Sequence, residues 1–154
     1  MTTTDDPNTG PDGFECDVIV VGTDGSDEAA TAVAWAGGLA ARIDAAVVAV
    51  HAVGLLDHLP GEHQTVSIDI RDQIHALLES EWTQVLRDLG VEHNCVMEEG
   101  PPLLAIPRVA EREGADLIVV ASHGKGRASA LLLGSTSHGL AQMAELPVLI
   151  LPTR

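Results

Sequence analysis

Short, almost wholly apolar runs alternate along the chain with longer stretches in which apolar residues recur every three or four positions. The apolar runs lie at 18–21, 45–50, 116–121 and 147–151. Strands that are apolar on both faces are typical of the buried interior of a parallel sheet. Residues 91–98 alternate weakly between apolar and polar, which predicts an edge strand with its polar side chains outward.

The stretches between these runs predict four helices, and local signals indicate their ends. Ser26 or Asp27 is a suitable N-cap for the first helix, and Gly90 is a suitable terminator for the second. Pro107 lies near the start of the third helix, so this helix either kinks there or begins later. The expected helices cover residues 28–41, 68–89, 103–113 and 135–144.

Two adjacent glycines, Gly37 and Gly38, lie inside the first expected helix. Glycine in a helix interior costs stability relative to alanine, by about 1 kcal/mol. A close contact between this helix and the sheet is one reason for a small residue here.

The elements alternate strand, helix, strand from beginning to end. This order predicts one α/β domain over residues 16–154, with an open, doubly wound parallel sheet and helices on both faces. The polar stretch 54–65 is expected to be a loop, and residues 1–15 to be an acidic, disordered leader. The sequence shows neither an internal repeat nor a second domain.

Composition excludes several classes of function. Only Phe14, Trp35 and Trp82 are aromatic, so the core is aliphatic and stacking surfaces for single-stranded nucleic acid are lacking. Eight Lys and Arg residues against 23 Asp and Glu residues leave a formal net charge of −15. This charge repels nucleic acids and anionic membranes, and no apolar stretch is long enough to span a bilayer. We therefore expect neither nucleic acid nor membrane as a partner.

Cys16 and Cys95 are far apart in the sequence and lack the spacing of a metal site. A secreted disulfide framework is usually denser, so the pattern favours two free thiols in a cytosolic protein. The N-terminus also lacks the basic and apolar regions of a signal peptide. The expected location is the cytoplasm.

Ligands of open doubly wound sheets collect outside the carboxyl ends of the strands. Three polar or glycine-containing segments follow strands here: residues 22–26, His51 with Ala52, and residues 121–135. The first and third follow the two most apolar runs, which we expect to be adjacent central strands. The chain order therefore predicts that Asp24 meets the glycine-containing segment.

The segment 121–135 has the features of an anion site. Gly124 and Gly126 let backbone amides approach an anion without an intervening Cβ atom. Gly134 and Ser135 then begin a helix, whose free N–H groups favour phosphate.

The same segment contains two of the chain's few cations, Lys125 and Arg127. A flexible connection followed by an ordinary helix cap is the alternative explanation. The pattern is neither a Walker A loop nor a GxGxxG dinucleotide fingerprint.

Other polar residues give weaker signals for chemistry. His58 and His63 share one stretch, but no spacing typical of zinc ligands supports a specific metal site. No serine lies in a GxSxG elbow, so no catalytic nucleophile is predicted. His123 either contacts phosphate or points to solvent, and Asp24 is expected to bind rather than catalyse.

The chain resembles the universal stress protein family from residue 16 to its end. The family's nucleotide signature is glycine, two residues, glycine, nine residues, glycine, then Ser or Thr. Gly124, Gly134 and Ser135 match it in type and spacing, while Ala121 replaces the first glycine. The segment 20–26 and the terminal strand 146–150 agree with the family as well.

This resemblance implies a five-stranded sheet in the order 3-2-1-4-5 with four helices, the adenine nucleotide alpha hydrolase-like fold. It also implies ATP or another adenine nucleotide, ADP, AMP or cyclic AMP, in a cleft between strands 1 and 4. Mg²⁺ would arrive with the phosphates. The implied ligand-binding residues are Thr23, Asp24, Ala52, Ala121, Gly124, Lys125, Arg127, Gly134, Ser135 and Thr136.

Within that set, Asp24 would lie by the adenosine and the Ala52 backbone would meet the adenine. Gly124, Gly134, Ser135 and Thr136 would line the ribose and phosphates. The Ala121 methyl group costs little if its backbone has negative φ, and about 1 kcal/mol if φ is positive.

The expected function is a nucleotide-responsive regulatory protein of the stress response. Any ATP hydrolysis should be slow or partner-dependent, because a Walker B carboxylate and an arginine finger are lacking. The resemblance and the apolar last strand also predict a homodimer, since an exposed edge strand invites pairing with a second copy. The predicted interface residues are Val148, Leu149, Ile150 and Leu151. The alternative is a dimeric interaction protein that binds no nucleotide.

Overall fold

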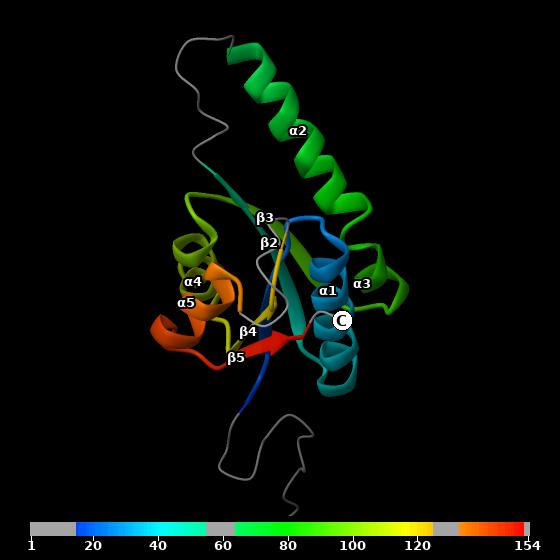
Figure 1. Cartoon of the computed structure of the whole chain (residues 1–154). Helices are drawn as coiled ribbons and strands as arrows, with labels where there is room; N and C mark the ends of the chain where they lie inside the picture. Colours follow the sequence, from blue (N-terminus) through cyan, green and yellow to red (C-terminus); the bar gives the residue numbers. More distant parts are fainter. Residues whose placement is uncertain (1–14, 55–63, 125–132, 153–154) are drawn as a thin grey trace, which may run out of the picture.

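A computed structural model describes residues 15–54, 64–124 and 133–152 and contains one five-stranded sheet (Figure 1). All strand pairs are parallel, and the order is β3-β2-β1-β4-β5, which confirms the predicted fold class. Strands β3 and β5 are therefore the two edges. The strands are β1 (Val18–Gly22), β2 (Ala46–Val53), β3 (His93–Glu99), β4 (Leu117–Ala121) and β5 (Val148–Leu151).

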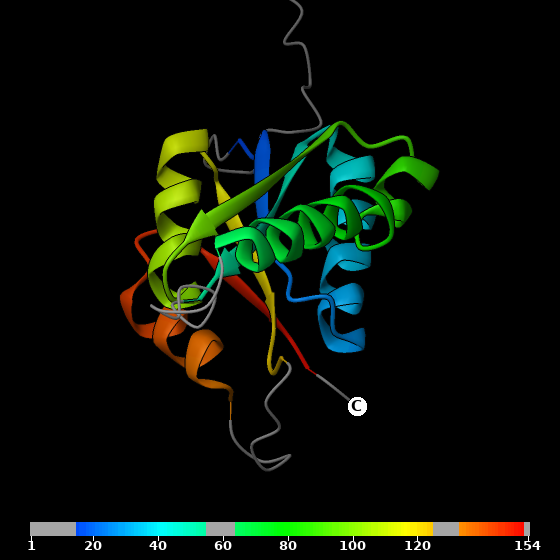
Figure 2. The same cartoon turned by 90° about the horizontal axis from the view of Figure 1, so that it is seen from above.

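Helices cover both faces of the sheet. Helices α4 and α5 lie on one side of the strands and α1 on the other (Figure 2). Alternation along β1 supplies both layers: Ile19 and Val21 pack on the α1 side, and Val20 packs on the α4 side. The helices are α1 (Asp27–Ile43), α2 (Gln64–Ser80), α3 (Gln84–Asp88), α4 (Pro102–Glu113) and α5 (Ser135–Met143). Among the described residues, none of these helices is long and apolar enough to cross a membrane.

The prediction of a single helix over residues 68–89 is wrong, because a turn at 81–83 separates α2 from α3. The Thr83 hydroxyl donates to the Leu78 carbonyl at 2.7 Å, and the Trp82 amide bonds the Leu77 carbonyl. These bonds replace the regular helical pattern. Leu78 and Leu86 on either side of the turn are both fully buried, so the apolar spacing continues through the break.

Local capping geometry supports several of the other predicted helix ends, although α2 begins four residues before the predicted residue 68. Ser26 is the N-cap of α1, and its hydroxyl accepts a hydrogen bond from the Ala29 amide. Gly90 and Gly114 both have positive φ where a helix ends. Pro107 lies inside α4, which begins at Pro102 and not later. The predicted loop at 54–65 falls mostly outside the described residues, and α2 begins within it, at Gln64.

Both cysteines are free thiols, as predicted. Cys16 is buried and Cys95 is half-buried beside Thr83. Burial raises the pKa of both thiols above its ordinary value; Asp116 and Asp17 raise that of Cys16 further, whereas the hydrogen bond with Thr83 opposes part of the increase at Cys95. Both side chains are therefore protonated at neutral pH and poor nucleophiles.

Gly37 makes a close contact between helices rather than the expected contact with the sheet. A Cβ atom at Gly37 would lie 2.7 Å from the Leu86 Cδ2 atom of α3, whereas one at Gly38 would meet, among the described residues, only Arg42, at 3.5 Å. Since Leu86 is fully buried, it has little room to move.

The variant Gly38→Ala should therefore raise the free energy of unfolding by about 0.5–1 kcal/mol, through helix propensity alone. Gly37→Ala should lower it, because overpacking a filled core costs about 1–3 kcal/mol. Urea denaturation of both variants measures the difference. Equal stabilisation by the two changes would contradict the close contact.

Candidate functional site

A pocket opens where β1, β2 and β4 end. The cavity volume there is about 120 Å³. The strand ends and the segments after them supply most of the wall, and α4 supplies an apolar side. The lining residues are Gly22, Thr23, Asp24, Ala29, Val50, His51, Ala52, Pro102, Ile106, Val120, Ala121, His123, Gly124 and Thr136.

The segment after β1 holds Asp24 in a defined conformation. One Asp24 carboxylate oxygen, Oδ1, accepts hydrogen bonds from the Ser26 amide at 3.0 Å and the Ser26 hydroxyl at 2.5 Å. The Thr23 amide donates to the Val50 carbonyl of β2, and the Gly25 amide donates to the Thr23 hydroxyl. Asp24 is thus placed at the pocket by a tight turn rather than by a flexible loop.

Asp24 and Gly124 meet across the pocket, although 100 positions separate them in the sequence. A Cβ atom at Gly124 would lie 2.4 Å from the Asp24 Oδ2 atom. Strands β1 and β4 are adjacent, which explains why their carboxyl ends bring these residues together. The predicted meeting of Asp24 with the glycine-containing segment is confirmed.

The start of α5 packs tightly against the end of β4. The Gly134 amide donates to the Ser122 carbonyl at 2.7 Å, and the Ser137 hydroxyl donates to the same carbonyl at 2.8 Å. A Cβ atom at Gly134 would lie only 3.0 Å from that oxygen. The first amide to bond within the helix is that of His138, so the amides of residues 135–137 precede the helical hydrogen-bond ladder.

Six of the ten predicted ligand-binding residues line the pocket. Gly134 and Ser135 do not line it but directly precede Thr136, which does. Lys125 and Arg127 lie outside the described residues, as do His58 and His63. The lining members of the predicted set are Thr23, Asp24, Ala52, Ala121, Gly124 and Thr136.

Ala121 is the last residue of β4 and pairs with Leu151 of β5. Its backbone is extended, so the case of positive φ does not apply. The methyl group at this position therefore causes no backbone strain, and its effect is limited to occupying space in the pocket wall.

Sequence reasoning missed the α4 side of the pocket. Pro102 and Ile106 line it. A Cβ atom at Gly22 would lie 2.8 Å from the Ile106 Cδ1 atom, so α4 packs closely on the end of β1. Only their i, i+4 spacing on a helix that covers the sheet could have indicated them. Within the described part of the chain, no group of three or more His, Cys, Asp or Glu side chains is placed to hold a metal ion.

Comparison with known proteins gives consistent matches. The sequence model of the universal stress protein family matches residues 16–152. A universal stress protein of Methanocaldococcus jannaschii is 33% identical over 141 residues, which cover 86% of this chain and 79% of that protein. A universal stress protein of Mycobacterium tuberculosis is 29% identical over 134 residues, and these cover only 44% of its length.

Among solved structures, a universal stress protein in complex with cAMP superimposes with a TM-score of 0.70 at 28% identity, covering 90% of this chain and 98% of that one. The family match includes all five strands and every described residue of the pocket. This chain therefore belongs to the universal stress protein family.

Proposed function

We propose that this protein binds an adenine nucleotide in the pocket between β1 and β4 and acts as a nucleotide-responsive regulatory dimer in the cytoplasm. The observation that carries the proposal is the convergence of Asp24, Gly124 and the start of α5 at one pocket. Apolar walls next to a few directed polar groups are typical of small-molecule sites.

The end of β2 is suited to an adenine base. Strand β1 pairs with β2 only as far as Gly22 and Val50, and the Val50 carbonyl faces β1. Because alternate residues of a strand direct their backbone groups to the same side, Ala52 directs its N–H and C=O toward β1 beyond the last paired residue. An adenine edge needs one donor and one acceptor of this kind, and Ile106 adds an apolar surface for the ring.

The start of α5 is suited to phosphate. The amides of residues 135–137 precede the helical ladder, and the positive end of the helix dipole favours an anion there. Lys125 and Arg127 belong to the segment that joins β4 to this helix and are proposed to add charge. Mg²⁺ would be carried by the nucleotide phosphates. The relative solved with cAMP supports a ligand of this class.

The two sheet edges differ in a way that supports a dimer through β5. On the β3 edge, the Glu98 carboxylate pairs with Arg108 and Arg112, and Glu99 pairs with Arg71. Charged side chains protect an edge strand against pairing. On the β5 edge, Val148, Leu149 and Ile150 are apolar and only half-buried. A second copy is the proposed partner for this edge.

We expect Mg²⁺ with ATP or ADP to raise the melting temperature, because a ligand that binds only the folded state stabilises it. A concentration of about 100 times the dissociation constant adds about 2.7 kcal/mol. Thermal unfolding monitored by circular dichroism measures the shift, and native mass spectrometry of the purified protein looks for bound nucleotide. The same measurement with AMP gives the stabilisation that comes from adenosine and the first phosphate. The difference between the ATP and AMP shifts then gives the contribution of the outer phosphates.

No shift with millimolar ATP, ADP, AMP or cyclic AMP would contradict nucleotide binding. That result would favour the alternative function, a dimeric interaction protein without a nucleotide.

A further inference from the structure

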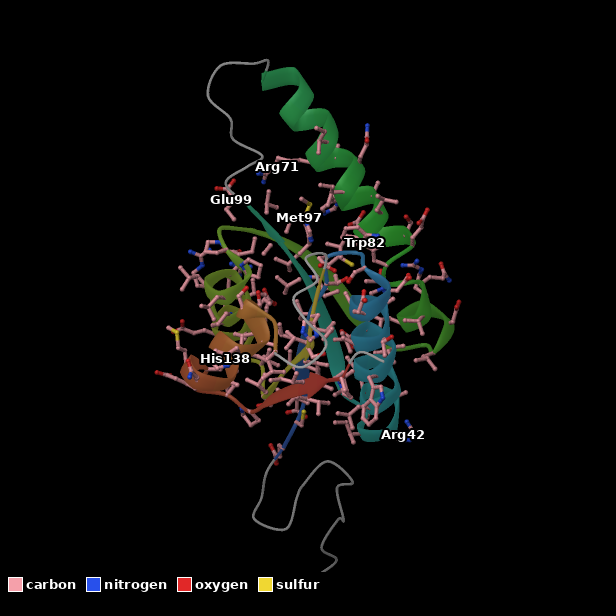
Figure 3. The ribbon with its side chains drawn as sticks, in the orientation of Figure 1. Arg42, Arg71, Trp82, Met97, Glu99 and His138 are labelled. Atoms are coloured by element: carbon pink, nitrogen blue, oxygen red, sulfur yellow. The ribbon has the colours of Figure 1, made fainter. Side chains whose placement is uncertain are left out.

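Trp82 lies in the turn between α2 and α3 and packs against the segment that carries Asp24. Figure 3 shows this side chain below α2, beside the upper end of α1. A Cβ atom at Gly25 would lie 2.3 Å from the Trp82 Cζ2 atom and 2.4 Å from Cε2. Gly25 also has a φ of +74°, a conformation that favours glycine. The indole therefore rests directly on the Gly25 backbone.

His51 connects the same indole to the other end of this segment. The His51 and Trp82 rings meet edge to face, with centroids 5.3 Å apart and planes at 68°. The His51 Nδ1 atom lies 2.9 Å from the Thr23 carbonyl oxygen. Trp82 and His51 thus contact the residues on either side of Asp24, Gly25 and Thr23.

The turn that carries Trp82 is itself well anchored. Leu78 before it and Leu86 after it are fully buried, and the buried Thr83 hydroxyl bonds the Leu78 carbonyl. Trp82 is not among the residues that line the pocket. Its position has the geometry of a support rather than of a ligand contact.

We propose that Trp82 is a positioning residue: it holds the segment Thr23–Ser26 so that the Asp24 carboxylate faces Gly124 and the pocket. The consequence for ligand affinity rests on the proposed nucleotide binding. The apolar spacing does not predict the turn at 81–83 between α2 and α3. This turn then has a role, because it places the Trp82 indole against Gly25. Occupation of the pocket should in turn change the surroundings of the indole.

The chain offers a direct spectroscopic test, because its only other tryptophan, Trp35, lies on α1 and is 55% exposed. In a Trp35→Phe variant, all tryptophan emission comes from Trp82. Addition of Mg²⁺-ATP should change the intensity or wavelength of this emission with the same midpoint as binding measured by calorimetry. Binding by calorimetry without any change in emission would overturn the proposal.

Affinity tests the positioning role. Trp82→Ala should weaken Mg²⁺-ATP binding about tenfold, which corresponds to ~1.4 kcal/mol, while Trp82→Phe should recover most of the loss. Trp35→Ala removes the same side chain at a remote site and should leave the affinity unchanged. Wild-type affinity in a folded Trp82→Ala protein would overturn the proposal.

A third measurement needs no ligand and keeps this inference distinct from the proposed function. Hydrogen exchange of the Gly25 and Ser26 amides in the ligand-free protein should accelerate in Trp82→Ala and not in Trp35→Ala. If the wild type binds no nucleotide but exchange accelerates, the proposed function fails and the positioning of the segment stands. Unchanged exchange overturns the positioning role itself.

Discussion

Replacement of Gly134 by Val is expected to abolish nucleotide binding while the sheet and helices remain folded. A Cβ atom at this position would lie 3.0 Å from the Ser122 carbonyl oxygen and 3.5 Å from the His123 Cα atom. These are backbone atoms at the end of β4, so they cannot rotate away. The branched side chain would push the start of α5 away from the pocket, and with it the amides proposed to bind phosphate. We expect a loss of affinity of at least about 100-fold, or ~2.7 kcal/mol.

Calorimetry with Mg²⁺-ATP measures this loss, and far-UV circular dichroism tests whether the fold is kept. Gly38→Val is the matched control, because a Cβ atom there lies 3.5 Å from the Arg42 side chain, and neither residue lines the pocket. Ala121→Gly restores the family's first glycine and should leave the affinity equal or improved. Wild-type affinity in Gly134→Val would show that this segment only connects β4 to α5.

The second large effect is expected at the sheet edge, where Leu149→Lys should convert the proposed dimer into a monomer. Leu149 pairs with Val119 of β4 and is only half-buried in the single chain. In a two-fold antiparallel arrangement, each β5 strand faces its own copy, so one substitution introduces two like charges at an apolar contact. An unpaired charge in such a contact costs far more than it would on the surface.

Sedimentation at tens of micromolar measures the oligomeric state of the wild type and the variant. Met143→Lys is the control, since Met143 is an exposed apolar side chain on α5 and 65% of its surface is accessible. Part of the Leu149 side chain packs on the core, so denaturation of the variant must confirm that it is folded. A wild type that sediments as a monomer would refute the dimer outright.

Hydrophobic patterning alone identified all five strands, because each strand buries one or both faces in a single sheet. The edge character of β3 was also predicted from its weaker alternation, and β3 is one of the two edges of the sheet. Parallel strands place their carboxyl ends on one side, so the meeting of Asp24 and Gly124 followed from chain order. The spacing of Gly124, Gly134 and Ser135 indicated the family only together with the segment 20–26 and the terminal strand 146–150.

The strand order, by contrast, came from the family resemblance and not from the pattern. Periodicity states which face of an element is buried but not which neighbour buries it. The roles of the ten predicted ligand-binding residues remain predictions, although the structure places six of them around one pocket.

Tertiary structure alone decided the features that depend on contacts between distant segments. The division of α2 from α3 is invisible in the apolar spacing, because Leu78 and Leu86 keep the same buried face across the break. Leu86 of another helix leaves no room for a side chain at Gly37, and the Trp82 indole leaves none at Gly25. The apolar wall formed by Ile106 likewise depends on where α4 crosses the sheet. Local sequence specifies buried faces and chain turns, whereas close approach between side chains is set only when the elements pack.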